Sequence, residues 1–254
     1  EDNGVYDNTY IIYTSDNGWQ LGQHRLSYDK RQLYENDIRV PFIVTGPGVP
    51  ANTTTKEIVL NVDIAPTMVD IATHRSGQEL SWYSIRDAAD QMDGTSFLPA
   101  IFGRSDYDSE DKAGFRQDFL VSYHGEGYAQ CDNFWSCPAP KEGDTDYRMG
   151  DWSNNTYHCI RTISQDENTI YCRFLDHENF VEFYDLRNDE WQMFNVYESL
   201  SLEQRFHYET RLDQLHMCKG KTCRQSPNDY DTQLKGSVSY RTKASSVVTV
   251  DMKA

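Results

Sequence analysis

The chain has 254 residues, of which 40 are acidic and 24 basic, and its formal net charge is −16. The acidic balance argues against general nucleic-acid binding, which needs a basic surface, and an aromatic content of 13% argues against a disordered chain. No apolar run approaches the roughly 18 residues that a membrane-spanning helix needs, so we expect no membrane span.

The chain opens with the loop-like sequence Glu1–Gly4 and shows no signal pattern before an apolar stretch at Tyr10–Tyr13. The aromatic and β-branched residues of that stretch predict a buried strand of a parallel sheet. An opening of this kind is typical of the middle of a longer protein. We therefore expect an N-terminal half that lies outside these 254 residues.

The predicted strand ends in Ser15-Asp16-Asn17-Gly18, whose residue types favour a sharp turn. Ligands of open α/β sheets bind beyond the carboxyl ends of the strands, which places Asp16 and Asn17 at a candidate site. A segment with the cationic residues His24, Arg25, Lys30 and Arg31 follows, and then a second predicted strand at Val40–Val44. An oxygen pair beside a cationic loop suits a divalent cation and an anionic substrate held side by side.

The rest of the first region alternates strands with helices, which predicts a parallel α/β sheet. We expect a strand at Ile58–Leu60, a helix over Asn61–Ala72, a turn and short helix over Met92–Gly103, and a strand at Asp118–His124. The first helix has Asp63 as a candidate N-cap and Pro66 in its first turn. Its apolar periodicity predicts one buried face, made of Ile64, Thr67, Met68 and Ile71.

The second region has a different character. Residues 125–156 are rich in Gly, Asp, Asn and Pro and predict a long loop. A β-hairpin is expected from Tyr157–Ile163 and Thr169–Phe174, and a third strand with one solvated face from Phe180–Leu186. Residues 199–217 predict a helix with the apolar members Leu202, Phe206, Leu212 and Leu215, and with Arg205, Glu209 and Arg211 exposed. These patterns divide the chain into residues 1–124, a loop at 125–156, and an antiparallel-sheet subdomain with helix and tail at 157–254.

Six cysteines form three local pairs, which predicts disulfides and an oxidising compartment. The spacing leaves the connectivity open; we favour Cys131–Cys137, Cys159–Cys172 and Cys218–Cys223. Buried thiols are one alternative, and zinc ligation is a weaker one because no CxxC pair is present. Sequons at Asn52 and Asn154 agree with a secretory route.

Several stretches together resemble the type I sulfatases of the alkaline-phosphatase-like superfamily. They are SDNG at Ser15–Gly18, GQHRL at Gly22–Leu26, DKRQLYE at Asp29–Glu35, IRVPFIVTGPG at Ile38–Gly48, NVDIAPTMVDIA at Asn61–Ala72, MDGTSFLP at Met92–Pro99 and FVEFYDLRNDEWQMFNV at Phe180–Val196. The resemblance implies the C-terminal part of an α/β sulfatase sandwich, followed by a smaller antiparallel-sheet α+β subdomain. DKRQLYE, the YHCIRT hairpin and the late cysteine pair most resemble the N-acetylglucosamine-6-sulfatase branch of the family.

The resemblance also implies roles for the candidate residues. Asp16 and Asn17 match two ligands of a Ca²⁺ ion, and Lys30 matches a lysine that contacts the sulfate ester. His24 lies in the family's Gly-x-His segment and is implied to bind sulfate or sugar, or to protonate the leaving alcohol. Further candidates for substrate contact are Arg31, His124 with Glu126, and Arg161. A structural role is the alternative for His24, His124 and Arg161.

Family members use a formylglycine made from a cysteine in a C-x-P/A-S-R motif, and none of the six cysteines begins that motif. The nucleophile and the remaining calcium ligands are thus expected in the N-terminal half, and this chain alone is expected to be inactive. The intact lysosomal or secreted protein would remove 6-O-sulfate from N-acetylglucosamine residues of heparan or keratan sulfate. The alternatives are another arylsulfatase or extracellular endo-sulfatase, a related phosphohydrolase, and a non-catalytic glycan-binding protein.

Overall fold

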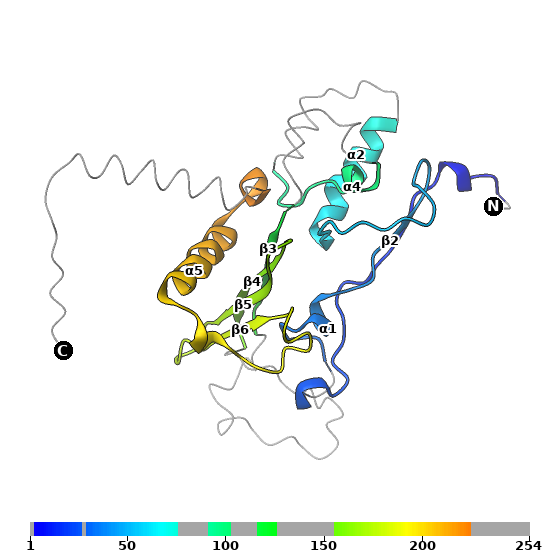
Figure 1. The fold of residues 1–254 in the computed structure, drawn as a ribbon. Helices are drawn as coiled ribbons and strands as arrows, with labels where there is room; N and C mark the ends of the chain where they lie inside the picture. Colours follow the sequence, from blue (N-terminus) through cyan, green and yellow to red (C-terminus); the bar gives the residue numbers. More distant parts are fainter. Residues whose placement is uncertain (1–2, 27–28, 76–90, 103–115, 126–154, 225–254) are drawn as a thin grey trace, which may run out of the picture.

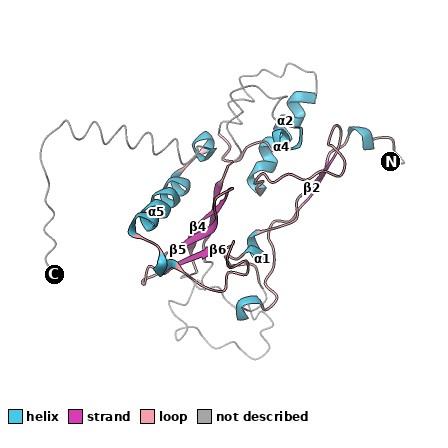
Figure 2. Ribbon diagram, in the orientation of Figure 1, coloured by secondary structure: helices cyan, strands magenta, loops and turns pink. Residues whose placement is uncertain are grey.

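The computed structural model describes residues 3–26, 29–75, 91–102, 116–125 and 155–224 (Figure 1). Its strands form a two-stranded ribbon and a four-stranded sheet, and the helices lie around them (Figure 2). The ribbon contains β1 (Ile11–Tyr13) and β2 (Ile43–Thr45); the sheet has the order β3 (Asp118–Tyr123), β4 (Tyr157–Ile163), β5 (Asn168–Phe174), β6 (Val181–Asp185). The α-helices are α1 (Glu35–Ile38), α2 (Ile64–Arg75), α4 (Leu98–Phe102) and α5 (Leu202–Met217).

The parallel sheet predicted for the first region is wrong for the described strands. β1 and β2 pair antiparallel, with Ile12 opposite Val44. A parallel pair needs a crossover connection, whereas the described helices between β1 and β2 are a 3₁₀ turn and the single helical turn α1. The predicted burial of β1 is wrong as well, because Ile11 is 47% and Tyr13 63% exposed.

Two further strand assignments of the first region need correction. β3, expected in the parallel sheet, pairs antiparallel with β4 over its whole length. Ile58–Leu60 forms no strand and runs as irregular chain into a 3₁₀ turn at Asn61–Asp63. A short apolar run signals burial and extension, but its pairing partner depends on contacts far along the chain. The predicted domain division stays a prediction, since most of residues 125–156 lies outside the described ranges.

The predicted hairpin is confirmed, and β4 pairs with β5 so that Cys159 lies opposite Cys172 and forms a disulfide with it. Buried side chains cover both faces of the sheet, because successive residues of a strand point to opposite sides. One face gathers Leu33, Tyr157, Cys159, Ile170, Cys172, Tyr184 and Leu186; the other gathers Ile160, Tyr171, Phe183, Leu200, Tyr208, Leu212 and Leu215. α5 thus covers one face and the segment before α1 the other (Figure 1). The solvated face predicted for β6 is wrong, since its central three residues are all buried.

The predicted helix over residues 199–217 is confirmed as α5, but the residues predicted to line its buried and exposed sides are partly wrong. Tyr208, Arg211, Leu212 and Leu215 form the buried stripe at helical spacing, whereas Leu202 and Phe206 are exposed. Arg211, expected at the surface, is buried against Asp118. The predicted Cys218–Cys223 disulfide that follows α5 is confirmed, and Cys131–Cys137 lies outside the described residues.

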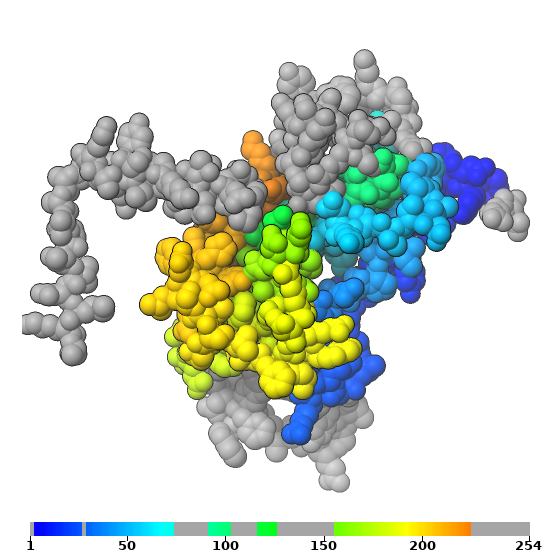
Figure 3. Space-filling model, in the orientation of Figure 1, coloured from blue at the N-terminus to red at the C-terminus, as the bar shows by residue number. Residues whose placement is uncertain are grey.

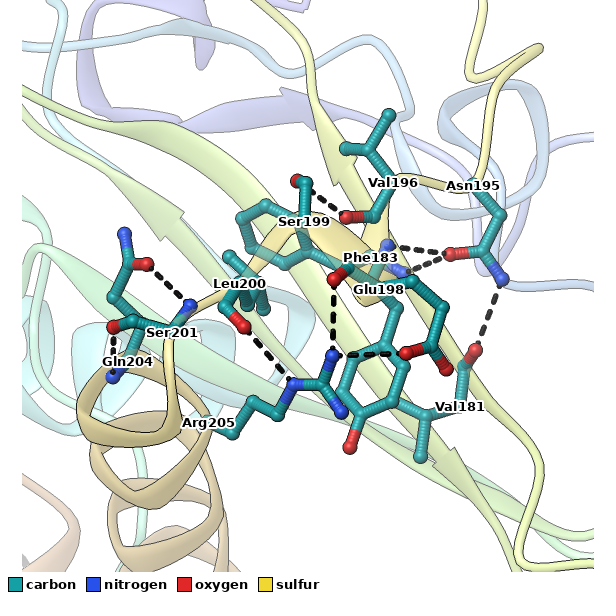
Figure 4. Close-up of polar contacts among 11 residues, drawn as sticks. Val181, Phe183, Asn195, Val196, Glu198, Ser199, Leu200, Ser201, Gln204 and Arg205 are labelled. Atoms are coloured by element: carbon teal, nitrogen blue, oxygen red, sulfur yellow. Dashed lines mark hydrogen bonds and ion pairs between the residues drawn. The ribbon is translucent and has the colours of Figure 1, made fainter.

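α5 begins with a capping box. Ser201 Oγ accepts the N–H of Gln204 at 3.2 Å, and Gln204 Oε1 accepts the N–H of Ser201 at 2.9 Å (Figure 4). Replacing Ser201 by alanine removes one acceptor and is expected to lower the free energy of unfolding by about 1 kcal/mol. Urea unfolding followed by circular dichroism measures this change. Ser201→Asp keeps an acceptor and serves as the control; equal losses in both variants would contradict a capping role.

The predicted helices at 61–72 and 92–103 are confirmed as α2 and α4, with Pro66 in the first turn of α2. Asp63 does not serve as the predicted N-cap of α2: its carboxylate accepts the N–H groups of Leu60 and Thr95 and binds Arg116 bidentately at 2.7 and 2.8 Å. Of the predicted buried face, Thr67 is fully buried but Met68 is exposed. Among the described residues, no helix combines the length and the hydropathy that crossing a membrane requires.

Candidate functional site

The chain segment after β1 is held by backbone contacts with the end of α1. Gly18 N donates to Asp37 O at 2.6 Å, and Trp19 N donates to Asn36 O at 2.9 Å. A Cβ atom on Gly18 would lie 1.9 Å from Asn36 O, so no side chain fits at this position. The glycine of the SDNG motif is therefore required by the close approach of two chain segments.

A second support comes from Asn61, which sequence reasoning assigned no role. Its Nδ2 donates to the carbonyl oxygens of Ser15 at 3.0 Å and Asp16 at 3.2 Å. The side chain reaches across from the 3₁₀ turn before α2 and fixes the backbone at the strand end. The NVD sequence at residues 61–63 was the one local signal that could have drawn attention to Asn61. The contacts themselves could not be predicted, because Asn61 lies 46 positions after Ser15 and 45 positions after Asp16.

The structure brings Asp16 and Lys30 together. Lys30 Nζ lies 3.9 Å from Asp16 Oδ2, and their side chains are 46% and 82% exposed. An ion pair this exposed adds little stability. Its importance is that it places a carboxylate and an ammonium group at one point of the surface, as the sequence predicted.

The side-chain oxygens of Asp16 and Asn17 fit part of a calcium site. Asn17 Nδ2 donates to the carbonyl of Gly18 at 2.7 Å, and among the described residues no hydrogen bond occupies Asn17 Oδ1. Ca²⁺ takes about six to eight oxygen ligands, preferably carboxylate and carbonyl oxygens. The described residues contain no group of three or more acidic, histidine or cysteine side chains that could hold a metal ion. Asp16 and Asn17 therefore suit a ligand set that other residues must complete.

His24 lies in a 3₁₀ turn at Gln23–Arg25 with unusual backbone geometry. His24 has φ of 55° and Arg25 has φ of 61°, the left-handed region that residues other than glycine seldom occupy. The imidazole stacks on the ring of Tyr34, with a centroid distance of 4.0 Å and an interplanar angle of 17°. Burial lowers the pKa of His24, and the negative charge of Asp189 opposes this by raising it. Among the described residues, no contact joins the imidazole to Asp16 or Lys30.

Arg31 and His124 lie in other surroundings. The Arg31 guanidinium is 3.4 Å from Asp29 Oδ2, so a neighbouring carboxylate already engages it. His124 is exposed just after β3, with its ring 5.6 Å from that of His158, which is 4.1 Å from that of His216. Burial, followed by the neighbouring His216, His124 and Arg173, lowers the pKa of His158 to about 4. Within the described ranges, no contact places this histidine group beside Asp16 or Lys30.

Arg161 has a structural role. It is buried, and its Nε donates to Glu35 Oε1 at 2.8 Å while Nη1 donates to the carbonyls of Thr162 and Thr169. Glu35 N in turn donates to Gln192 Oε1 at 2.8 Å. These contacts fasten the chain that follows Lys30 to the four-stranded sheet. Glu126 and Asn154 lie outside the described residues; Asn52 is exposed in a turn.

Comparisons with known proteins identify relatives. The sequence profile of the sulfatase family matches residues 1–74. N-acetylglucosamine-6-sulfatase of Bos taurus is 43% identical over 235 residues, which are 91% of this chain and 38% of the relative. The Homo sapiens protein of that name is 42% identical over 90% of this chain and 38% of its own length. An extracellular sulfatase SULF-1 homolog of Drosophila melanogaster is 44% identical over 40% of this chain and 8% of its own length. The chain thus spans 38% of the length of the first two relatives.

Solved structures support the fold. BT4656, solved in complex with its substrate D-glucosamine-2-N,6-O-disulfate, matches 87% of this chain and 36% of its own with a TM-score of 0.59 and 24% identity. A phosphonate monoester hydrolase of Agrobacterium radiobacter matches 85% of this chain and 36% of its own with a TM-score of 0.57 and 22% identity. These likenesses confirm the predicted fold class, part of an α/β fold shared with these two proteins and followed by a smaller antiparallel sheet. The motifs around Asp16 and Lys30, the profile match over residues 1–74 and the 43% identity over 91% of the chain agree, and all three show that this chain is similar to the sulfatases.

Proposed function

We propose that the intact protein containing this chain is a sulfuric ester hydrolase that removes 6-O-sulfate from N-acetylglucosamine residues of glycosaminoglycans. The observation that carries the proposal is 43% identity, over 91% of this chain, to N-acetylglucosamine-6-sulfatase. The pairing of Lys30 with Asp16 supports it, because a hydrolase of sulfate esters needs a cation for its anionic substrate beside a metal-binding carboxylate. The glucosamine disulfate bound by BT4656 is a substrate of the same chemical class.

In this proposal Asp16 and Asn17 supply two oxygen ligands of a Ca²⁺ ion. The ion, when bound, supplies Lewis-acid activation of the nucleophile, a formylglycine from outside these 254 residues. The Lys30 ammonium neutralises charge that grows on the sulfate and the leaving oxygen. His24 protonates the leaving alcohol, and its lowered pKa makes its imidazolium a stronger acid. Arg31 and His124 are proposed as substrate contacts farther from the reacting atoms.

We further propose that the protein acts in the lysosome or outside the cell. The disulfides Cys159–Cys172 and Cys218–Cys223 support an oxidising compartment. A relative named as an extracellular sulfatase agrees with this placement. The exposed sequon at Asn52 offers an accessible glycosylation position.

The test is an assay of the intact protein and its Lys30→Ala variant on three substrates: 6-O-sulfated N-acetylglucosamine, an aryl sulfate and an aryl phosphate. We expect hydrolysis of the 6-O-sulfate, with kcat/KM about 10²-fold lower in the variant, because a charge that stabilises the transition state is lost. Lys221→Ala, an exposed lysine in the turn after α5, serves as the control and should match the wild type. Turnover of the phosphate ester alone would overturn the proposal.

A further inference from the structure

We propose that Tyr34 is a positioning residue for His24, and that Glu182 and Tyr184 of the four-stranded sheet hold Tyr34 in place. The inference rests on the proposed function only in that His24 serves the reaction. It assigns to β6 a part in the candidate site, although β6 belongs to a different sheet from β1, the strand that precedes Asp16.

Tyr34 gives His24 a surface to lie on. The nearly parallel stack, at 4.0 Å and 17°, fixes the plane of an imidazole whose backbone is already in the left-handed region. Leu33, directly before Tyr34, is buried in the core beside Tyr157 and Tyr184, which anchors the segment. A ring held by its neighbours in this way can present one nitrogen in a constant direction, and catalysis depends on such constancy.

Tyr34 is itself held by a buried carboxylate. Its hydroxyl group is near enough to Glu182 and Tyr184 for both to influence its pKa, and Tyr184 donates to Glu182 Oε2 at 3.0 Å. The rings of Tyr34 and Tyr184 meet edge to face at 6.2 Å. Burial, followed by the charge of Glu182, raises the pKa of Tyr34 to about 12, so its phenol stays protonated. Burial also raises the pKa of Glu182. A buried acidic group needs such partners, which explains why two phenols converge on it.

The turn after β6 supplies the charge that faces His24. Asp189 raises the pKa of the imidazole, and its own position is fixed by an N–H from Phe194 at 2.8 Å. Gln192 ties this turn to the N–H of Glu35 at 2.8 Å. Figure 3 shows the yellow segment after β6 against the blue segment around α1. The titratable side chains that the structure places around His24 are therefore Tyr34 and Asp189.

The segment that follows the turn after β6 is held against β6 by the side chain of Asn195. Asn195 Oδ1 accepts the N–H of Phe183 at 3.1 Å, and its Nδ2 donates to the carbonyl of Val181 at 2.9 Å (Figure 4). Val196 N adds a bond to Phe183 O at 3.0 Å. Since Glu182 lies between the two clamped residues, the same contacts that hold the turn also hold the carboxylate that anchors Tyr34.

The first readout is the titration of His24 in the intact protein, followed by NMR of histidines labelled at Cε1 and assigned with His24→Gln. Tyr34→Leu removes the ring that buries His24, so its pKa should rise toward the ordinary value of about 6.5. Tyr34→Phe keeps the ring but loses the hydroxyl contacts, and should shift the pKa in the same direction by a smaller amount. Tyr34→Phe also keeps the test decisive if the leucine variant does not fold.

Tyr208→Phe is the matched control, because Tyr208 is another buried tyrosine that donates to a glutamate, Glu167, on the opposite face of the sheet. It should leave the titration of His24 unchanged. An unchanged His24 pKa in both Tyr34 variants, or an equal shift in Tyr208→Phe, would overturn the proposal.

The second readout is kinetic. Tyr34→Phe should lower kcat about tenfold with little change in KM, since the substrate contacts remain and only the orientation of His24 is loosened. Glu182→Gln, which keeps an oxygen acceptor for the phenols, should retain more activity than Glu182→Leu; equal losses would contradict the anchoring role of Glu182. If the intact protein hydrolyses no sulfate ester, the proposed function fails, while the NMR titration still decides whether Tyr34 positions His24.

Discussion

Replacing Asp16 by alanine is expected to abolish the calcium-dependent activity of the intact protein, lowering kcat/KM by about 10³-fold. The carboxylate is the charged member of the oxygen pair at the end of β1, and it is also the group that Lys30 Nζ approaches at 3.9 Å. Its loss removes the proposed metal ligand and the counter-charge of the lysine together. The side chain is 82% exposed, so its removal should hardly change stability, and the lost activity can be attributed to chemistry.

The measurement is activity against Ca²⁺ concentration after removal of metal with a chelator, with thermal unfolding recorded for each variant. Asp166→Ala, in the exposed turn between β4 and β5, serves as the matched control and should respond to calcium like the wild type. We expect Asp16→Ala to stay inactive at every calcium concentration with an unchanged unfolding temperature. Unchanged turnover in Asp16→Ala would refute the assignment of this residue to the metal site.

The elements that the sequence predicted correctly are those with local signals. The β4–β5 hairpin has two apolar runs around a polar turn at Ser164–Glu167, and its cysteines face each other across the strands. α5 has a capping box within its first four residues. The pairing direction of β1 and the sheet to which β3 belongs had no such signal. Strand propensity depends on the surroundings and does not fix the pairing direction, and the partner of β3 begins 34 residues beyond its end (157 minus 123).

In the candidate site, too, the residues with a local sequence signal were predicted and those with only long-range contacts were not. Asp16, Asn17 and Lys30 stand in a recognisable local pattern, and the structure brings the aspartate and the lysine together. The residues that support them were not predictable, because their contacts span long stretches of chain. Asn61 reaches back to Ser15 across 46 residues, and Glu35 is held by Gln192 across 157. The importance of such a side chain becomes visible only when the fold brings its partner within hydrogen-bond distance.

Arg211 shows the limit of reading a helix by hydropathy. A charged residue is assigned to the surface unless its partner is known, and the partner here is Asp118, 93 residues earlier in the chain. Arg211 Nε donates to Asp118 Oδ2 at 2.7 Å and Nη2 donates to Oδ1 at 2.8 Å, with both side chains only 5% exposed. This bidentate pair joins α5 to the edge strand of the sheet.

Replacing Arg211 by alanine is therefore expected to lower the free energy of unfolding by about 3–5 kcal/mol, because it leaves the Asp118 carboxylate buried without its partner. Urea unfolding of the purified protein measures the loss. Arg205→Ala is the matched control on the same helix. Arg205 pairs at 3.0 Å with Glu198, which is 88% exposed, so this variant should lose far less stability than Arg211→Ala.

The double variant Asp118→Leu/Arg211→Met separates the two parts of the argument. A buried ion pair gains attraction but loses the hydration of both charges, and well-packed apolar side chains of similar volume often replace it with little loss. We expect the double variant to be at least about 2 kcal/mol more stable than Arg211→Ala, since it removes the stranded charge as well. If Arg211→Ala and Arg205→Ala were equally mild, the pair would not be desolvated as the structure shows. If the double variant were as unstable as Arg211→Ala, the hydrogen bonds themselves, and not the unpaired carboxylate, would be what joins α5 to β3.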